Sequence, residues 1–200
     1  MKRERICHVF SHLPELTTPR LLLRRMCVGD TEDMYEYARR SEVTRYLLWS
    51  PHPDVYYTRD YLNYLTTRYA AGSFYDWGVV CRENGRMIGT CGFSTIDCAH
   101  DVAEIGYVLN PDYRGQGFSP EAVRAVLSFG FEQLGFHRIE ARFIEGNTAS
   151  LRVMQKVGMQ FEGYRREAML IKGAYRTVGY CSILKQEYEK MRENVGDGLE

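Results

Sequence analysis

Hydrophobic positions along the chain change their spacing several times, and each change marks a new element. Residues 138–144 alternate apolar and charged side chains, which is the period of a half-buried strand. Val123 and Leu127 recur instead at helical spacing, and Gly135 follows as a helix stop. Residues 105–109 form an apolar run rich in strand-forming side chains. The pattern therefore predicts strands and helices mixed along one chain.

The same reasoning predicts the other elements. Asn84 and Gly85 indicate a tight hairpin turn between two strands, because this pair accepts positive φ. Strands are expected at residues 18–25, 76–82, 86–96, 103–109, 138–144, 159–165 and 173–184. Helices are expected at residues 31–40, 54–70, 119–134 and 147–156.

This order predicts an α+β fold in a single domain, with a mixed, mostly antiparallel sheet flanked by helices. The domain is expected to span residues 18–184. Residues 1–17 lack a clear period and are interpreted as an N-terminal extension. Residues 185–200 form a charged C-terminal tail that is expected to fray.

Composition narrows the classes of function. The 26 basic residues balance the 26 acidic ones, which argues against a nucleic-acid partner held by bulk charge. No apolar run approaches the roughly 20 residues that span a bilayer, and no signal-peptide pattern opens the chain, so no membrane partner is expected. The six cysteines are scattered without a Cys-x-x-Cys pair, which predicts no metal site, no disulfide framework and a cytoplasmic location.

The chemistry is expected around residues 104–121, where a strand, a glycine loop and a helix start follow one another. Ser119 is a good N-cap and Pro120 suits the first helical position. Gly115 and Gly117 let the backbone approach a ligand closely, and the free N–H groups of the first helical turn attract anions. Together these features predict an anion cradle suited to a phosphate.

This loop resembles a known family motif. Its residues match the pattern Gln/Arg-x-x-Gly-x-Gly/Ala of the GNAT superfamily of acetyl-CoA-dependent N-acetyltransferases, with serine at the final small position. The matching residues are Arg114, Gly115, Gln116, Gly117, Phe118 and Ser119. The resemblance implies that these residues hold the phosphates of acetyl-CoA, the co-substrate, with Arg114 adding charge. The alternative is a plain strand-to-helix turn that needs glycine for its angles.

A second motif follows one strand later. Residues 147–159 resemble the family segment Asn-x-x-Ser/Ala that ends in glycine and an apolar residue. The opening Thr-Pro-Arg-Leu at residues 18–21 is similar to the branch that contains the ribosomal-protein N-terminal acetyltransferases. The predicted element order matches that of the family over nearly all of residues 18–184.

The resemblance also implies catalytic roles. Glu104, at the head of the central strand, stands where the family often has the base that removes the amine's proton. A solvated carboxylate is the alternative, and Asp97, His100 and Asp101 are reserve candidates. Backbone N–H groups around Val108 and Leu109 are expected to bind the developing oxyanion, where this strand of the family separates from the next one.

The acid for the leaving thiolate departs from a common family pattern. Many members carry a tyrosine seven residues after the motif asparagine, and this chain has Met154 there. Ser150 matches the serine of the ribosomal-protein branch and is the candidate that protonates or positions the sulfur. Asn147 is expected to contact the pantetheine amides. Both residue types also cap helices, which is the alternative for each.

These expectations define one function. The chain is interpreted as an N-acetyltransferase that acts by direct attack of a primary amine in a ternary complex, as a monomer or homodimer. A protein N-terminal α-amine suits the chemistry, since its pKa of about 7.7–8.0 lies below lysine's 10.4 or so. Two alternatives stay open: a small-molecule amine acetyltransferase acting on a polyamine, antibiotic or metabolite, and a non-catalytic acyl-CoA-binding domain. Aromatic residues at Trp49, Trp77 and along residues 56–69 could wall the acceptor site or pack the core.

Overall fold

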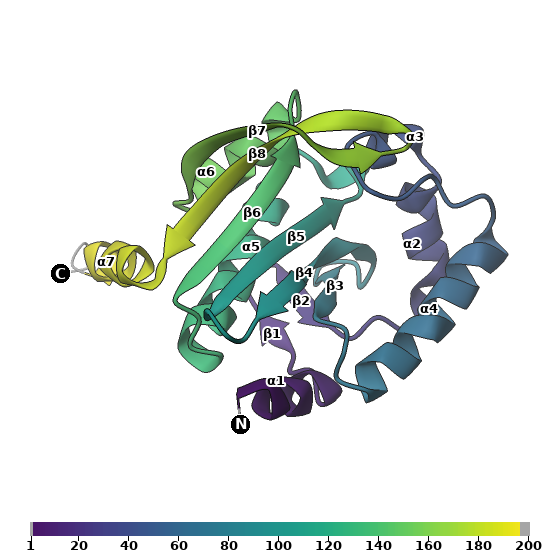
Figure 1. Ribbon diagram of the computed structural model, residues 1–200. Helices are drawn as coiled ribbons and strands as arrows, with labels where there is room; N and C mark the ends of the chain where they lie inside the picture. The colour runs from purple at the N-terminus through teal and green to yellow at the C-terminus, as the bar shows by residue number, and fades with distance from the viewer. Residues whose placement is uncertain (1, 197–200) are drawn as a thin grey trace.

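The strands predicted from hydrophobic spacing pair into one sheet. The computed structural model describes residues 2–196, and in this part the sheet has eight strands in the order β1-β2-β3-β4-β5-β6-β8-β7 (Figure 1). Neighbouring strands are antiparallel except β5 and β6, which run parallel. Their bounds are β1 Leu16–Thr17, β2 Leu21–Arg24, β3 Asp76–Cys81, β4 Met87–Asp97, β5 Val102–Leu109, β6 Arg138–Ile144, β7 Gln160–Ile171 and β8 Ala174–Leu184. The predicted α+β fold is confirmed.

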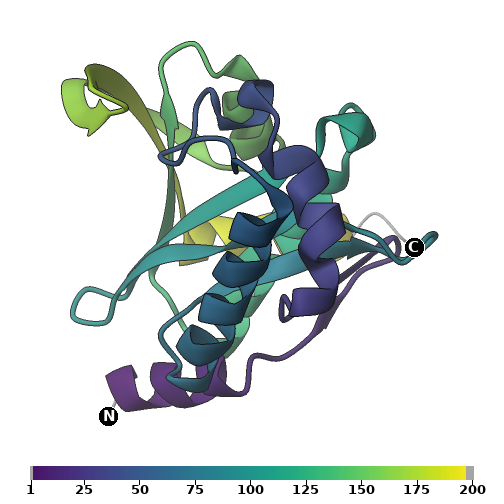
Figure 2. The same ribbon diagram turned by 90° about the vertical axis from the view of Figure 1, so that its right-hand side faces the viewer.

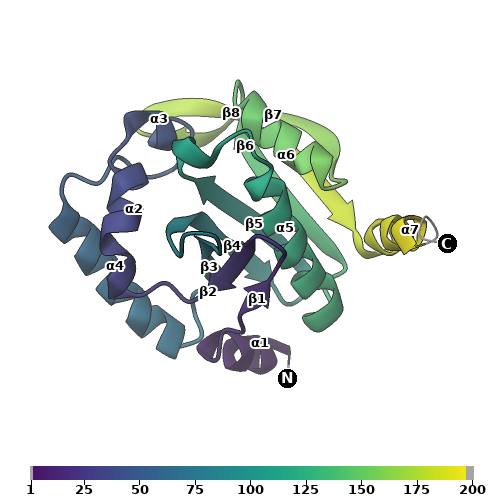
Figure 3. The same ribbon diagram turned by 180° about the vertical axis from the view of Figure 1, so that it is seen from behind.

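Helices cover both faces of the sheet. α5 and α6 lie against one face (Figure 3), and α2 and α4 cross in front of the other (Figure 2). α1 and α7 lie at the ends of the molecule (Figure 1). The helix bounds are α1 Lys2–Ser11, α2 Thr31–Ala38, α3 Ser41–Thr44, α4 Val55–Ala70, α5 Phe118–Ser128, α6 Thr148–Lys156 and α7 Lys185–Gly196.

The parallel pair β5–β6 separates soon after it forms. The two strands pair only from Val102 opposite Arg138 to Glu104 opposite Glu140. Beyond this point β5 continues beside β4 as far as Leu109, while all of β6 stays paired with β8. The sheet therefore opens between β5 and β6 (Figure 1), as the family resemblance implied.

Both ends of the chain are better structured than the sequence suggested. The first residues form helix α1, whose Phe10 is 0% exposed and packs edge-on against Tyr75 and Trp77. The expectation that the tail frays from Lys185 is wrong for the described part, where α7 continues to residue 196. Tyr188 of α7 stacks on Phe131 with ring centroids 4.9 Å apart, so burial of an aromatic ring holds this helix. Residues 197–200 lie outside the described part.

The described part of the chain, residues 2–196, lacks membrane-spanning helices, disulfides and metal-binding clusters. None of its helices is long and apolar enough to cross a membrane. All six cysteines are free thiols. No cluster of three or more His, Cys, Asp or Glu side chains in residues 2–196 could hold a metal ion.

Replacing Phe10 by alanine should lower the free energy of unfolding by about 3–5 kcal/mol, because it empties a fully buried aromatic site. Urea unfolding followed by circular dichroism would measure the change. Arg3→Ala on the exposed face of α1 is the control and should stay within about 0.5 kcal/mol of wild type. A loss below about 1 kcal/mol for Phe10→Ala would mean that α1 contributes little to the core.

Candidate active site

The glycine loop forms the anion cradle that its sequence predicts. Gly115 and Gly117 have φ of +78° and +83°, values that favour glycine, and α5 begins directly after them at Phe118. In the described structure, the backbone N–H groups of residues 115–119 have no acceptor within the protein. Free N–H groups in a glycine loop and at a helix N-terminus together attract a phosphate.

An ion pair holds this loop against the start of the domain. Arg20 donates from Nε to Glu121 Oε2 at 2.7 Å and from Nη1 to the carbonyl of Gln116 at 2.9 Å. Thr18 donates to the same carboxylate at 2.6 Å. Partial burial opposes ionisation of Glu121, yet the bonds from Thr18 and Arg20 and the Arg20 charge lower its pKa. The Thr-Pro-Arg-Leu opening thus fixes the first turn of α5.

A cavity of about 410 Å³ extends from this loop along the end of β5 to helix α6. It brings together most of the predicted site residues, from both motifs. Those lining it are Val108, Leu109, Arg114, Gly115, Gly117, Phe118, Ser119, Asn147 and Ser150. Gln116 belongs to the loop but does not line the cavity, and its side chain turns back toward the Asp112 carbonyl.

Two cations that the sequence reading missed line the same cavity. Arg152 and Lys156 lie one turn apart on α6 and join Arg114 around the glycine loop. Their spacing of four residues within the second motif was the available signal, since it places both on one helix face. Three positive side chains beside free N–H groups suit a ligand that carries several phosphates.

The direction of the strand N–H groups corrects one expectation. Asn110 donates its N–H to the Ile88 carbonyl of β4 at 2.7 Å. Because N–H groups alternate sides along a strand, Val108 also points its N–H at β4, whereas Tyr107 and Leu109 point theirs into the gap. Leu109 and Tyr107 are therefore the candidate oxyanion donors, and Val108 contributes only to the cavity lining.

Ser150 and Asn147 occupy the first turn of α6. Asn147 caps the helix, because its Oδ1 accepts from the Ser150 N–H at 3.2 Å. It therefore has the helix-capping role that the sequence offered as its alternative. Its side-chain NH₂ group has no partner in the described structure. Met154, at the position where many relatives have tyrosine, is 1% exposed in the core.

A tyrosine nevertheless reaches this turn, from β5 rather than from α6. The hydroxyl of Tyr107 lies 2.9 Å from Ser150 Oγ and donates to the Ser150 carbonyl at 3.0 Å. Burial raises the pKa of Tyr107 despite the bond to Ser150, so the hydroxyl keeps its proton. Sequence spacing could not reveal this pair, because it depends on how α6 lies over β5.

Glu104 lies beside the site rather than in a cavity. Its Oε1 is 2.9 Å from Arg142 Nε and accepts from Ser94 Oγ at 2.9 Å. Ser94 lines the larger cavity described below, so the carboxylate touches that cavity through one hydroxyl. Glu104 is therefore a partnered carboxylate on β5, and not the solvated one of the alternative.

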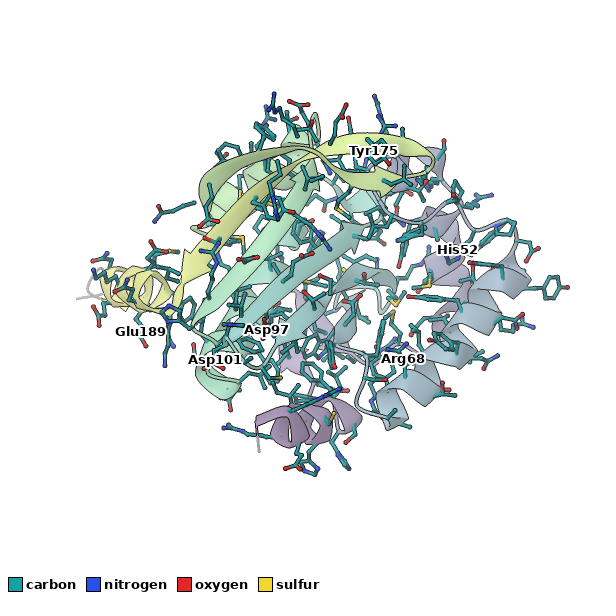
Figure 4. All side chains as sticks on the ribbon, viewed as in Figure 1. His52, Arg68, Asp97, Asp101, Tyr175 and Glu189 are labelled. Carbon is teal, nitrogen blue, oxygen red and sulfur yellow. The ribbon has the colours of Figure 1, made fainter. Side chains whose placement is uncertain are left out.

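The reserve candidates belong to a surface turn. Asp97 Oδ2 lies 2.9 Å from His100 Nδ1, and both side chains are more than half exposed. The bond from His100 lowers the pKa of Asp97. Figure 4 shows Asp97 and Asp101 together at the lower end of the sheet, apart from His52 and Arg68 beside α4. They stabilise the β4–β5 turn.

A second cavity, of about 670 Å³, lies between the sheet and helices α2 and α4. Trp49, His52 and tyrosines of α4 contribute to its wall, whereas Trp77 is 0% exposed and belongs to the core. Leu47, Tyr107 and Val108 line this cavity and the first one alike. A ligand in each cavity would therefore meet the other at the gap beside β5.

One carboxylate lines this second cavity. Burial raises the pKa of Asp76 to about 7, against the opposing hydrogen bonds from Thr90 and the Trp77 N–H. His52 lines the same cavity with Nδ1 2.8 Å from Thr58 Oγ1, and burial lowers its pKa. At neutral pH the cavity thus holds a neutral imidazole and a carboxylate that is partly protonated.

Comparison with known proteins gives the family. A family model described as an acetyltransferase (GNAT) domain matches residues 20–160. The chain belongs to the GNAT family of N-acetyltransferases. Both motifs, the open β5–β6 pair and the strand order are thus those of a GNAT domain.

Individual GNAT proteins resemble the chain over most of its length. An uncharacterized N-acetyltransferase p20 of Bacillus licheniformis is 36% identical and covers 86% of this chain and 97% of its own. A GNAT acetyltransferase structure from Bacillus anthracis is 30% identical, with a TM-score of 0.77 over 86% of this chain and 99% of its own. RimL, a ribosomal L7/L12 alpha-N-protein acetyltransferase solved with coenzyme A, has a TM-score of 0.73 at 20% identity over 86% and 98%, which shows the shared fold.

Asp76→Asn should stabilise the protein more at pH 8 than at pH 5. Folding raises the pKa of Asp76 from 3.8 to about 7, so its protonated form favours the folded state, and this contribution is lost as pH rises through that range. The asparagine cannot ionise, so the gain should differ between the two pH values by on the order of 2 kcal/mol.

Urea unfolding at both pH values would measure this difference. Asp60→Asn, on the exposed side of α4, is the matched control and should show no such pH dependence. An equal effect of Asp76→Asn at pH 5 and pH 8 would contradict the raised pKa.

Proposed function

We propose that this GNAT enzyme transfers the acetyl group of acetyl-CoA to a primary amine by direct attack in a ternary complex. The observation that carries the proposal is that the two cavities share Leu47, Tyr107 and Val108. One cavity starts at the anion cradle, and the other lies between the sheet and helices α2 and α4. Two substrates can therefore be bound at once with their reacting ends together. No covalent intermediate on the protein is needed.

The residues of the smaller cavity fit acetyl-CoA. Free N–H groups of residues 115–119 and the cations Arg114, Arg152 and Lys156 suit its phosphates. The open edge of β5 and the unpartnered NH₂ group of Asn147 suit its amide-containing arm. When bound, acetyl-CoA supplies an activated acetyl group as a thioester.

Groups of the protein itself would take the amine's proton and stabilise the charges that develop on the oxygen and the sulfur. Tyr107 and Leu109 direct their N–H groups at the gap, where they would stabilise a developing oxyanion. Glu104 would take the amine's proton through Ser94, whose hydroxyl lies between the carboxylate and the cavity. Ser150, whose Oγ lies 2.9 Å from the Tyr107 hydroxyl, would donate a hydrogen bond to the departing sulfur, and the thiolate would then take its proton from solvent.

Acetyl-CoA should raise the melting temperature of the wild-type protein, and the double variant Arg152→Ala with Lys156→Ala should bind CoA at least tenfold more weakly. Each charge-assisted hydrogen bond to a phosphate contributes about 1.5–3 kcal/mol, so tenfold is a lower limit. Isothermal titration calorimetry with CoA would measure it. The double variant Arg176→Ala with Lys190→Ala, which removes two exposed cations elsewhere, is the control. Absence of any stabilisation by acetyl-CoA would overturn the proposed function.

Glu104→Gln should lower kcat by roughly 100-fold, because general-base catalysis contributes on that scale. Release of free thiol from acetyl-CoA with the best amine acceptor would measure kcat. Asp97→Asn, in the exposed turn, is the control and should keep the wild-type kcat. An unchanged kcat in Glu104→Gln would remove this residue from the base role.

A further inference from the structure

The floor of the larger cavity is bare backbone next to a carboxylate. On adjacent strands, Asp76 lies opposite Gly92, and Gly92 lies opposite Gly106. A Cβ atom added to Gly92 would come within 2.7 Å of Asp76 Oδ1, so this oxygen lies over the glycine backbone. Gly106 has nothing within 4 Å of the place where a Cβ would stand. Gly92 therefore permits the close approach of β3, whereas Gly106, on the next strand, leaves open space on the cavity floor.

Asp76 has polar partners but no counter-ion. Its Oδ1 accepts from the Trp77 N–H at 3.1 Å, and the Thr90 side chain donates to the carboxylate. In the described structure no cationic side chain pairs with it. Arg68 is the cavity's one permanent cation, and its guanidinium is bonded to Ser73 and the Tyr64 hydroxyl. A partly buried carboxylate without a cation is costly to the fold, which suggests that a ligand supplies the cation.

A second polar group of the cavity also lacks a partner. Tyr37 is 1% exposed and lines the cavity from α2, and its hydroxyl has no hydrogen-bond partner. Burial, with the charge of Asp76 as the next cause, raises the pKa of Tyr37, so the hydroxyl stays protonated. An unsatisfied buried hydroxyl costs about 1–3 kcal/mol, and because its oxygen is closed off from the cavity, a ligand leaves this cost in place. Asp76 is therefore the polar group of the floor that a ligand can compensate.

We propose that the acceptor of this enzyme is a small amine with one positive charge and an apolar, ring-sized body. Asp76 binds its ammonium group, the open space above Gly106 admits it, and the aromatic wall encloses its body. This inference rests on the proposed function and names the acceptor class for it.

The composition of the cavity favours this class over two others. A polyamine carries several charges, and Asp76 is the one carboxylate in the described lining. A protein N-terminus brings further peptide groups that need hydrogen-bond partners, whereas Met34, Leu65, Phe74 and other apolar side chains dominate the walls. A volume of about 670 Å³ suits a small molecule, since ligand pockets run to about 300–1,000 Å³.

The same placement prepares the amine for transfer. Gly106 lies between Glu104 and Val108 on one face of β5, and Ser94 of β4 donates to Glu104. An ammonium bound over Gly106 lies beside Ser94 on one side and the shared Val108 on the other. Asp76 therefore acts in recognition, and Glu104 acts on the proton.

Calorimetric titration with two probes of the same shape tests the proposal: 2-phenylethylamine, which is charged, and 2-phenylethanol, which is neutral. Spermidine and a tetrapeptide with a free N-terminus represent the excluded classes. The wild-type protein should bind the phenylethylamine at least tenfold more tightly than each of the other three. The titrations use the protein alone and need no turnover, so they stand even if acetyl-CoA does not bind.

Three variants connect the binding to named groups. Asp76→Asn should weaken phenylethylamine binding at least tenfold and change phenylethanol binding less than twofold. Tyr37→Phe should change phenylethylamine binding less than twofold and leave the melting temperature equal or higher, since it removes an unsatisfied buried hydroxyl that the ligand does not reach. Gly106→Ala, which the strand accommodates, should weaken both probes by filling the floor. Asp60→Asn on the outer side of α4 is the control.

Each contrary result is decisive. Equal affinity for the amine and the alcohol, or undiminished amine binding by Asp76→Asn, would overturn the proposal, as would binding of none of the four probes at millimolar concentration. Preference for spermidine or for the tetrapeptide would do the same while leaving acetyl transfer intact. A parallel titration with CoA reports on the proposed function separately, because it concerns the other cavity.

Discussion

The early end of the β5–β6 pairing is the constraint on which the site depends. Three residue pairs join the two strands, and from there each is held only by its antiparallel partner on the other side. Backbone N–H groups inside a protein are almost always paired, so a strand edge opened within a sheet leaves donors that need a ligand. The gap provides the edge of β5 for one substrate and a wall shared by both cavities.

The glycine loop depends on that gap for its position and on Arg20 for its rigidity. Left-handed angles at Gly115 and Gly117 turn the chain from the end of β5 into α5. Thr18 and Arg20 lie between β1 and β2, at one edge of the sheet. Both bind Glu121 in the first turn of α5. The N–H groups therefore stay oriented without a ligand, which lowers the conformational entropy lost when phosphates bind.

Local patterns made the fold and half of the site predictable, and contacts between distant residues explain the rest. The glycine loop, its helix and the Asn147 turn are contiguous, so local turn signals and the resemblance to family motifs identified them. α1 was missed although Ile6 and Phe10 are buried and four residues apart, because ten residues give too short a periodic signal. The Tyr107–Ser150 pair and the Asp76 carboxylate depend on strand register and helix packing, which a single sequence does not encode locally.

Asp76 illustrates why such residues mark function rather than stability. It places a carboxylate in an apolar setting without a counter-ion, and an asparagine there would fit the fold better. Stability therefore gives no reason for the carboxylate, and it does not line the cavity proposed for acetyl-CoA. A carboxylate that faces a cavity without a counter-ion is most simply explained by a ligand that supplies one. The larger cavity then selects its amine by charge at the floor and by shape at the walls, while the gap beside β5 brings that amine to the thioester.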